Sequence, residues 1–126
     1  MGIFGIGTDR IAIDRVERSL ERFGDHFIQR VYTDAEHQQA LAKGNTARRL
    51  AMLFAAKEAV SKSLGTGFRK GVMLRDIETI HQESGKPKVV LHGGAAAVAR
   101  AAGISTVHIS LTDDDGVAMA FAIAES

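Results

Sequence analysis

The segment 45–63 constrains the fold of this chain more than any other stretch. It is rich in alanine and leucine and contains neither glycine nor proline. Asn45 or Thr46 is suited to cap its start and Gly65 to end it, which predicts one long helix over roughly 45–63. Because a long alanine-rich helix packs tightly against its neighbours, we expect it to be the central helix of the fold.

Apolar periodicity predicts further elements on both sides of this helix. A short strand over 3–7 is interrupted by two glycines and is expected to end near Asp9. Thr33 and Glu36 fit a capping box, so a helix is expected to start at Thr33 and end by Gly44. The remaining expected elements are helices over 13–23 and 94–102 and strands over 76–81, 88–92, 106–112 and 117–124. Two hairpins and a lone first strand predict an α+β fold, an antiparallel or mixed sheet packed with helices.

Length and composition exclude several classes of protein. The 126 residues suit a single domain over 1–126, and the absence of cysteine excludes disulfides and cysteine metal sites. Sixteen basic and 15 acidic residues leave a net charge of +1, too balanced for a protein that coats DNA, so we expect no nucleic-acid partner. No apolar run is long enough for a membrane span and no secretory signal is present, which predicts a cytoplasmic protein without a membrane partner.

Several well-known motifs are absent. The segment Gly5–Arg10 begins like a dinucleotide fingerprint, but its sixth position is an arginine and the βαβ context is missing. There is no phosphate-binding loop of the G-x-x-x-x-G-K-[ST] type, no metal-ligand spacing among the histidines and no G-x-S-x-G motif. The candidate chemistry therefore rests on carboxylates and basic groups.

Three such groups are Asp9, Glu58 and Lys62. On a helix, Glu58, Ser61 and Lys62 share a face, because spacings of three and four return to one side. Taken alone, Glu58 and Lys62 form a solvated ion pair and Asp9 is a cap or turn residue. However, the loop 65–67 follows with backbone N–H groups expected to be free. Two carboxylates, a lysine and glycine amides are together suited to a Mg²⁺–diphosphate site.

The motifs as a set resemble one family closely. Gly5-Ile6-Gly7-Thr8-Asp9, the run FAAKEAVSKSLGTG and Ser84-Gly85-Lys86-Pro87 are similar to the holo-acyl-carrier-protein synthases, the small single-copy class of 4′-phosphopantetheinyl transferases, over the whole chain. The resemblance implies that fold and a Mg²⁺-dependent transfer of the phosphopantetheine arm of coenzyme A to a serine of apo-acyl carrier protein. Adenosine 3′,5′-bisphosphate is released, and the product supports fatty acid biosynthesis.

The resemblance also implies roles for individual residues. Asp9 and Glu58 would ligate Mg²⁺, Lys62 would contact a phosphate, and these three would form the catalytic group. The serine proton would pass to Glu58 or to a water that it holds. The residues implied to bind coenzyme A are Lys57, Ser61, Lys62, Gly65, Thr66, Lys86 and Pro87. A homotrimer with active sites between subunits is implied, with the 85–87 turn near the coenzyme A at a neighbour's interface.

A stripe of arginines lies on the expected helix 13–23. Arg15, Arg18 and Arg22 recur at spacings of three and four, which makes either a solvated basic face or a docking strip for an acidic partner. Acyl carrier proteins are small and acidic, so the resemblance favours docking. Two other functions remain open: a non-catalytic nucleotide- or acidic-protein-binding module on the same fold, and a small RNA-binding domain that uses the arginines.

The chain departs from the family at a few positions. Leu53 stands where an arginine is common, Ala12 where a glutamate is common, and some members carry a histidine near Asp113.

Overall fold

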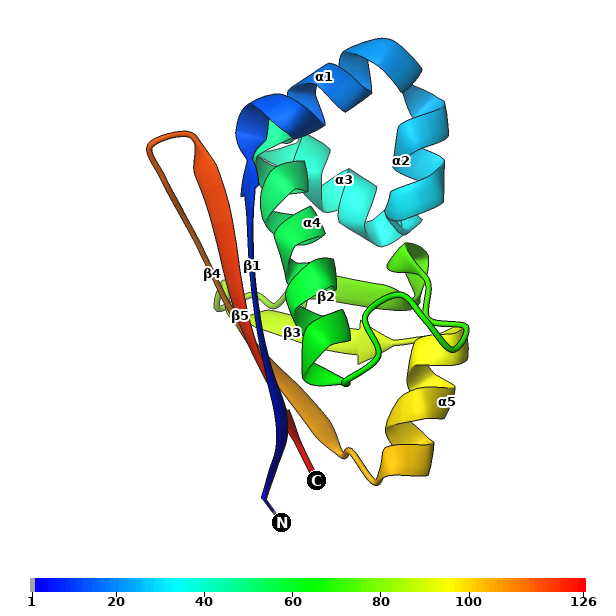
Figure 1. Ribbon diagram of the computed structural model, residues 1–126. Coiled ribbons are helices and arrows are strands. Elements are labelled where there is room, and N and C mark those ends of the chain that lie inside the picture. Colours follow the sequence, from blue (N-terminus) through cyan, green and yellow to red (C-terminus); the bar gives the residue numbers. More distant parts are fainter. Residues whose placement is uncertain (1) are drawn as a thin grey trace.

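The computed structural model describes residues 2–126, in which a long central helix lies between strands and shorter helices (Figure 1). The elements in chain order are β1 (Ile3–Ala12), α1 (Ile13–Phe23), α2 (Asp25–Val31), α3 (Asp34–Ala42), α4 (Thr46–Ser63), the 3₁₀ turn η1 (Leu74–Asp76), β2 (Ile77–His81), β3 (Pro87–Leu91), α5 (Gly93–Ala102), β4 (Thr106–Asp114) and β5 (Val117–Glu125). The predicted α+β class is confirmed.

The strands form two sheets rather than the one that the sequence predicted. β1, β5 and β4 lie side by side in that order and are antiparallel throughout, while β2 and β3 form a separate two-stranded hairpin. β1 therefore pairs with the last strand of the chain, with Asp9 opposite Ala120. The two chain ends lie together, where the Gly2 and Ser126 backbones exchange a hydrogen bond of 2.9 Å (Figure 1).

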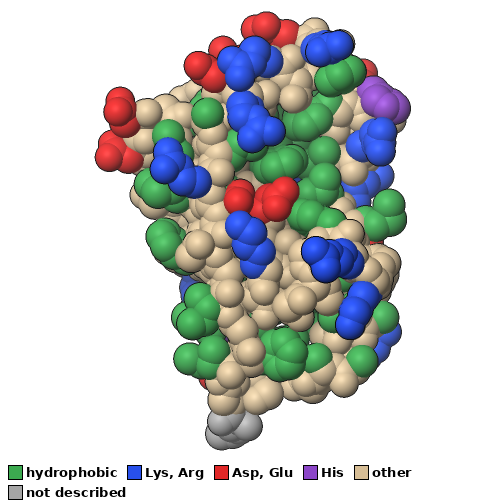
Figure 2. Space-filling model, in the orientation of Figure 1, with side chains coloured by type: hydrophobic (Ala, Val, Ile, Leu, Met, Phe, Trp, Pro, Cys, Tyr) green, Lys and Arg blue, Asp and Glu red, His purple; other side chains and the backbone are tan. Residues whose placement is uncertain are grey.

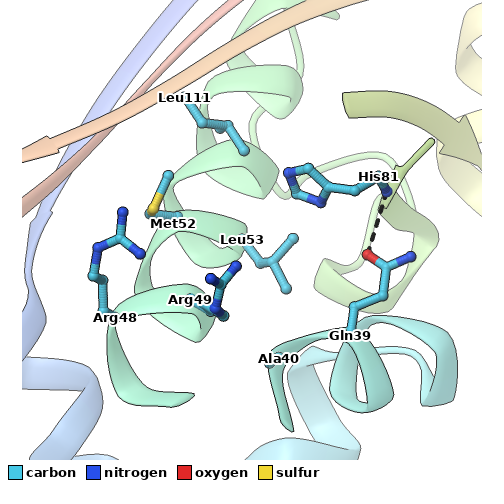
Figure 3. A pocket seen from close by; sticks show the side chains of 8 residues that line it. All are labelled: Gln39, Ala40, Arg48, Arg49, Met52, Leu53, His81 and Leu111. Atoms are coloured by element: carbon cyan, nitrogen blue, oxygen red, sulfur yellow. Dashed lines mark hydrogen bonds between the residues drawn. The ribbon is translucent and has the colours of Figure 1, made fainter. Parts of the chain in front are cut away.

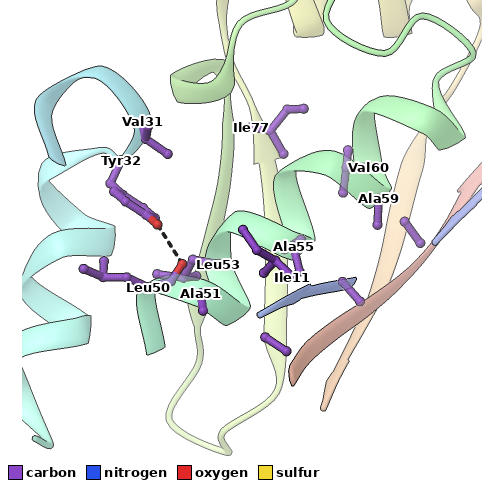
Figure 4. Packing of buried hydrophobic residues seen from close by; sticks show 14 of the residues in the cluster. Ile11, Val31, Tyr32, Leu50, Ala51, Leu53, Ala55, Ala59, Val60 and Ile77 are labelled. Carbon is purple, nitrogen blue, oxygen red and sulfur yellow. Dashed lines mark hydrogen bonds between the residues drawn. The ribbon is translucent and has the colours of Figure 1, made fainter. Parts of the chain in front are cut away.

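The central helix α4 packs on one face of the three-stranded sheet. β5 alternates so that Ala118, Ala120, Ala122 and Ala124 are fully buried, while Phe121 and Ile123 point to the other face and are exposed. Small side chains on both partners let the helix lie close to the sheet, as the packed cluster in Figure 4 illustrates.

The helices α1, α2 and α3 cover the N-terminal half of α4 (Figure 1). The buried Tyr32 belongs to this layer, and its hydroxyl donates to the Leu50 carbonyl at 2.7 Å (Figure 4). Burial, and secondarily the charge of Glu36, raises the pKa of this phenol. The layer is thus joined to α4 by a polar contact as well as by apolar packing. Within residues 2–126 no helix combines the length and the apolar composition needed to cross a membrane.

Local expectations are confirmed at some element boundaries and wrong at others. The capping box is present: the Thr33 hydroxyl accepts from the Glu36 N–H at 3.2 Å, and the Glu36 side chain accepts from the Thr33 N–H at 3.0 Å. Asn45 precedes α4 without capping it through its side chain. β1 continues to Ala12, so Asp9 lies within the strand and not at its end, and the β4–β5 turn is confined to Asp115 and Gly116.

Candidate active site

Two glycines in β1 determine how closely this strand approaches α4. A Cβ atom at Gly5 would lie 2.1 Å from the Ser63 carbonyl oxygen, and one at Gly7 would lie 1.8 Å from the Ala59 carbonyl oxygen. Any side chain there would overlap the helix backbone. Because residues 5, 7 and 9 face the same side of the strand, the side chain of Asp9 is directed to the α4 side of the sheet.

Asp9 and Lys62 meet where β1 passes α4. The Lys62 ammonium donates to the Thr8 carbonyl at 2.9 Å and to Asp9 Oδ1 at 3.3 Å. The Lys62 side chain is 51% exposed and that of Asp9 is 18% exposed, so water and ligands reach the pair. Within residues 2–126 the carboxylate of the half-buried Glu58 has no hydrogen-bond or ion-pair partner.

The electrostatics of Glu58 reflect its proximity to the pair. Its pKa is raised, first by partial burial and then by the negative charge of Asp9, while the positive charges of Lys62 and Arg15 act in the opposite direction. Two carboxylates that repel each other, one of them without a donor, favour the binding of a cation between them.

This donor set fits Mg²⁺. Within residues 2–126 no cluster of three or more His, Cys, Asp or Glu side chains could hold a metal alone. Mg²⁺ is commonly bound by one or two carboxylates and completes its octahedron with water and substrate phosphate. Asp9 and Glu58 could therefore hold the ion together with a phosphorylated ligand. A shallow hollow of about 320 Å³ opens beside Asp9 and Lys62; Thr8 and Phe121 also line it, and Glu58 is not among its lining residues.

The glycine loop after α4 differs from the expectation. The N–H groups of Gly65 and Gly67 are not free: they donate to the carbonyls of Lys62 and Ser61, each at 3.0 Å. Both glycines have positive φ, 83° and 55°, which turns the chain back against the helix end. Within the described residues the Thr66 N–H has no acceptor, so this amide could donate to a ligand.

The structure buries Lys57 and Ser61, two of the residues expected to contact coenzyme A, so neither side chain is exposed to a ligand in this chain. The Lys57 side chain is fully buried, and its ammonium donates to Glu36, Leu74 and Ile77. Burial lowers the pKa of Lys57, and the neighbouring charge of Glu36 opposes that shift. Ser61 is buried, and its hydroxyl donates to the Glu58 carbonyl at 2.7 Å. The expectation that Ser61 shares an exposed helix face with Glu58 and Lys62 is therefore wrong, because Ser61 faces the core.

Lys86 and Pro87 lie on the β2–β3 hairpin. The Lys86 N–H donates to Ser84 Oγ at 3.3 Å, and its carbonyl accepts from the Gln82 N–H at 2.9 Å, so the turn is closed within itself. None of the hydrogen bonds or ion pairs within residues 2–126 joins this hairpin to Asp9, Glu58 or Lys62. Within the described residues the turn therefore makes no polar contact with the candidate site.

The arginine stripe is present on α1. Arg15, Arg18 and Arg22 line a hollow of about 290 Å³ together with Ser19 and Phe23. Arg15 is close enough to Glu58 for its charge to lower the pKa of that carboxyl. Figure 2 shows an acidic group in the middle of this face with basic side chains on both sides of it. The stripe therefore borders the candidate site.

An apolar groove of about 890 Å³ continues from the stripe, and Phe23 lines both. Its other walls include Phe27 of α2, Phe54 of α4 and Leu74 of η1. Figure 2 shows apolar side chains gathered beside the acidic group on this face. Phe54 and Glu58 lie one turn apart on α4, which makes the groove a neighbour of the site.

Sequence reasoning missed a polar pocket beside the start of α4 (Figure 3). Arg48 donates to both carboxylate oxygens of Asp113, at 2.8 and 3.0 Å, and this bidentate contact lowers the pKa of Asp113. Arg49 and His81 line the same pocket, and burial and the charge of Arg49 lower the pKa of His81. The adjacent arginines Arg48 and Arg49 were a signal, but their partners lie far away in the chain.

Comparisons with known proteins agree with this architecture. The family model described as the 4′-phosphopantetheinyl transferase superfamily matches residues 5–122. The holo-[acyl-carrier-protein] synthase of Halorhodospira halophila is 50% identical over 96% of this chain and 96% of its own length. The crystal structure of the synthase from Neisseria meningitidis superposes with a TM-score of 0.90 at 36% identity, covering 98% of this chain and 99% of that one. The Helicobacter pylori synthase in complex with coenzyme A superposes with a TM-score of 0.84 at 28% identity, covering 95% and 99%.

Proposed function

The chain belongs to the 4′-phosphopantetheinyl transferase superfamily, and we propose that it performs the family's reaction where Asp9, Glu58 and Lys62 meet. It is a phosphopantetheinyl transferase: it transfers the 4′-phosphopantetheine group of coenzyme A to a serine of apo-acyl carrier protein. The observation that supports this location is the approach of two carboxylates and a lysine across the β1–α4 contact, with one carboxylate unpartnered.

The transfer reaction depends more on stabilisation of negative charge by the protein than on covalent catalysis by its side chains. The serine oxygen bonds to the β-phosphorus of coenzyme A, the anhydride P–O bond breaks, and the electron pair leaves with adenosine 3′,5′-bisphosphate. Asp9 and Glu58 would hold Mg²⁺, which when bound neutralises charge on the diphosphate. Lys62 keeps its ammonium at the site through Thr8 and Asp9, and Thr66 offers a backbone N–H. These donors stabilise the phosphate oxygens as charge develops on them.

The serine proton needs an acceptor near the metal ligands. Glu58 serves this role directly or through a water that it holds. Its pKa, raised by partial burial and by the charge of Asp9, makes the carboxylate a stronger base than a solvated one, while the charges of Lys62 and Arg15 favour its ionised form. Either route places the proton on the α4 side of the site, next to the arginine stripe.

The arginine stripe is the docking surface for the carrier protein. Arg15, Arg18 and Arg22 present three positive charges on one helix beside the site, and an acidic helical partner complements them. Charge complementarity of this kind raises the association rate and fixes the orientation of the incoming serine. The effect of the Arg15 charge on Glu58 supports this role, because it indicates that the stripe borders the site.

The assembly is a homotrimer with its sites at subunit interfaces. On the sheet face away from α4, Ile6 is 66% exposed, Phe121 49% and Ile123 38%, and Ile6 and Ile123 lie opposite each other in the register. Apolar side chains gathered on one sheet face favour coverage by other copies. The hollow at Asp9 and Lys62 is also lined by Phe121, so a neighbour on this face would border the site. Lys86 and Pro87 would then reach the coenzyme A of a neighbouring subunit.

We expect the enzyme in the cytoplasm.

Mass spectrometry of the carrier protein tests the function. Apo-acyl carrier protein incubated with coenzyme A, Mg²⁺ and this protein should gain the mass of one phosphopantetheine group. The gain should disappear with EDTA and with a carrier protein whose acceptor serine is replaced by alanine. A wild-type protein that is folded but gives no gain under these conditions would contradict the assignment.

A further inference from the structure

A fully buried ion pair lies on the side of α4 turned away from the sheet. Glu36 of α3 and Lys57 of α4 are both 0% exposed, and Lys57 Nζ lies 2.7 Å from Glu36 Oε1. The reaction described above uses neither side chain. Buried charges of opposite sign are uncommon in a small interior and occur almost only when they are paired.

Every strong hydrogen-bonding position of the pair is occupied. The Lys57 ammonium donates its other two protons to the carbonyls of Leu74, at 3.0 Å, and Ile77, at 2.6 Å. The Glu36 carboxylate also accepts the N–H groups of Thr33 and Thr79, each at 3.0 Å. The pair therefore joins α3, α4, η1 and β2 through directional contacts and not through apolar packing alone.

Apolar side chains of similar volume would fill this space at no greater cost in stability. Replacing both members of a buried ion pair by apolar residues is often neutral or stabilising. Apolar contacts do not fix the orientation of a helix about its own axis. An ammonium that donates hydrogen bonds to three fixed oxygens does, because any rotation of the helix would break them. On the opposite side, α4 is held against β1 by the close contacts at Gly5 and Gly7.

Lys57 directly precedes Glu58, so the rotation of α4 determines where the Glu58 carboxylate lies. A rotation of about 20° would move a group about 6 Å from the helix axis by about 2 Å. Displacements of about 1 Å in a reacting site cost about 100-fold in rate. We propose that Glu36 and Lys57 are positioning residues that fix the rotation of α4 and thereby the separation of Glu58 from Asp9. This inference rests on the proposed function of Asp9 and Glu58.

The test removes both charges at once. In the double variant Glu36→Leu/Lys57→Met, far-ultraviolet circular dichroism and the calorimetric stoichiometry of coenzyme A binding report the folded fraction. The ratio of the coenzyme A Kd in EDTA to that in Mg²⁺ reports how well the two carboxylates act together. We expect an unchanged stoichiometry, a fall in this ratio of about tenfold or more, and a similar fall in kcat at an unchanged KM for the carrier protein.

A merely structural pair gives a different result. Partial unfolding lowers the stoichiometry and the apparent kcat but leaves the Kd ratio of the folded molecules intact. A folded double variant whose ratio and kcat both stay within twofold of wild type overturns the proposal. Should the double variant fail to fold, Glu36→Gln, which keeps the side-chain shape, is measured in the same way. An unchanged Kd ratio in that folded variant also overturns it.

The matched control is Asp34→Asn. Asp34 and Arg75 bridge two of the four elements that the buried pair joins, α3 and η1, but at 3.9 Å and on the surface. This variant should leave the Kd ratio and kcat within twofold of wild type. A wild-type protein that shows no phosphopantetheine transfer and no Mg²⁺ effect on coenzyme A binding would instead overturn the proposed function, which separates the two failures.

Discussion

Lys57 and Lys62 lie on the same helix, little more than one turn apart, in opposite surroundings. Lys57 is fully buried and donates three hydrogen bonds, to Glu36, Leu74 and Ile77. Lys62 is half exposed and makes two contacts, with Thr8 and Asp9, at 2.9 and 3.3 Å. The chain itself accepts all three protons of the Lys57 ammonium, whereas Lys62 keeps a proton that it can donate to a ligand.

This difference separates the two junctions of α4. At the junction with α3 and β2 the polar groups are matched to one another, which determines structure. At the junction with β1, Glu58 lacks a partner, its pKa is raised by burial and by Asp9, and Lys62 is reachable from solvent. Incomplete pairing of titratable groups in an accessible place is typical of a functional site. Each prediction below tests whether a given residue belongs to the first kind of junction or to the second.

The largest effect is expected from the carboxylates at the β1 junction. Asp9→Ala and Glu58→Ala should each lower kcat by at least about 10³-fold, or about 4 kcal/mol of transition-state stabilisation, because each removes one of two ligands for the cation. Their melting temperatures should stay within a few degrees of wild type, since neither carboxylate is fully buried. The measurement is the rate of carrier-protein modification, with EDTA added to wild type as the comparison.

Activity of either variant within about threefold of wild type would show that its carboxylate is not a metal ligand. Asp34→Asn is a suitable control, because Asp34 is an exposed carboxylate on α3 that lies outside the β1–α4 contact. It should retain the wild-type rate within twofold.

The two lysines should differ most clearly in stability. Lys57→Met leaves Glu36 buried without its partner, and the free energy of unfolding should fall by about 3–4 kcal/mol. Lys62→Met removes an exposed contact, so its unfolding free energy should change by less than about 1 kcal/mol although its transfer rate falls. Urea denaturation of the two variants side by side measures the contrast. Equal losses of stability would remove the distinction between the junctions.

Much of the fold was predictable because its signals are local. The capping box at Thr33 and the span of α4 follow from neighbouring residues, and both are present. The two predicted hairpins, β2–β3 and β4–β5, are also present. The partner of the first strand was not predictable: β1 joins β5 at the far end of the chain, and no local pattern encodes that choice. The predicted single sheet is therefore two.

For the candidate site, too, the sequence predicted local features but not the contacts that depend on tertiary packing. Asp9, Glu58 and Lys62 were selected from motif and periodicity, and the fold brings them together. The burial of Lys57 was not predicted, because adjacent helix residues point about 100° apart and a motif can join an exposed residue to a core residue. Glu36 was not found, since its partner lies in another helix and only tertiary packing reveals the pair.

A smaller, salt-sensitive effect is expected from the arginine stripe, which borders the accessible junction of α4 with β1. Reversing Arg15, Arg18 and Arg22 to glutamate should lower kcat/KM for the carrier protein by about 30-fold at low salt, or about 2 kcal/mol. The wild-type value should fall as salt rises through about 0.15 M, where charges are screened over about 8 Å, and this dependence should flatten or invert in the variant.

Coenzyme A affinity, measured by calorimetry, is the control for the stripe. It should fall much less than kcat/KM for the carrier protein, because only Arg15 of the three arginines acts on the charge of Glu58. If coenzyme A affinity collapses while carrier-protein kinetics stay normal at saturating coenzyme A, the stripe does not dock the carrier protein.

The smallest effect is expected at Glu78 of β2, which lies at the edge of the junction of α4 with α3 and β2. Its carboxylate accepts from the Thr33 hydroxyl and contacts His92 Nε2 at 3.0 Å. Burial alone would raise the pKa of Glu78, but these two hydrogen bonds and the charges of His92 and Lys57 outweigh it and lower the pKa below its usual value near 4.5. The folded carboxyl therefore binds its proton less tightly than the unfolded one. Its contribution to stability is present above pH 4.5 and is lost as the pH falls through the lowered pKa.

Glu78→Gln keeps the shape of the side chain and removes this ionisation. At pH 7 the variant should unfold about 1 kcal/mol more easily than wild type, because a hydrogen bond to a charged group is replaced by a neutral one. The difference should shrink as the pH is lowered below 4.5 and vanish once wild-type Glu78 is protonated. Urea denaturation between pH 7 and pH 3 measures this, with the exposed hairpin residue Glu83→Gln as control. A difference that stays constant over this range would show that the carboxylate acts at the junction through its shape and not through its charge.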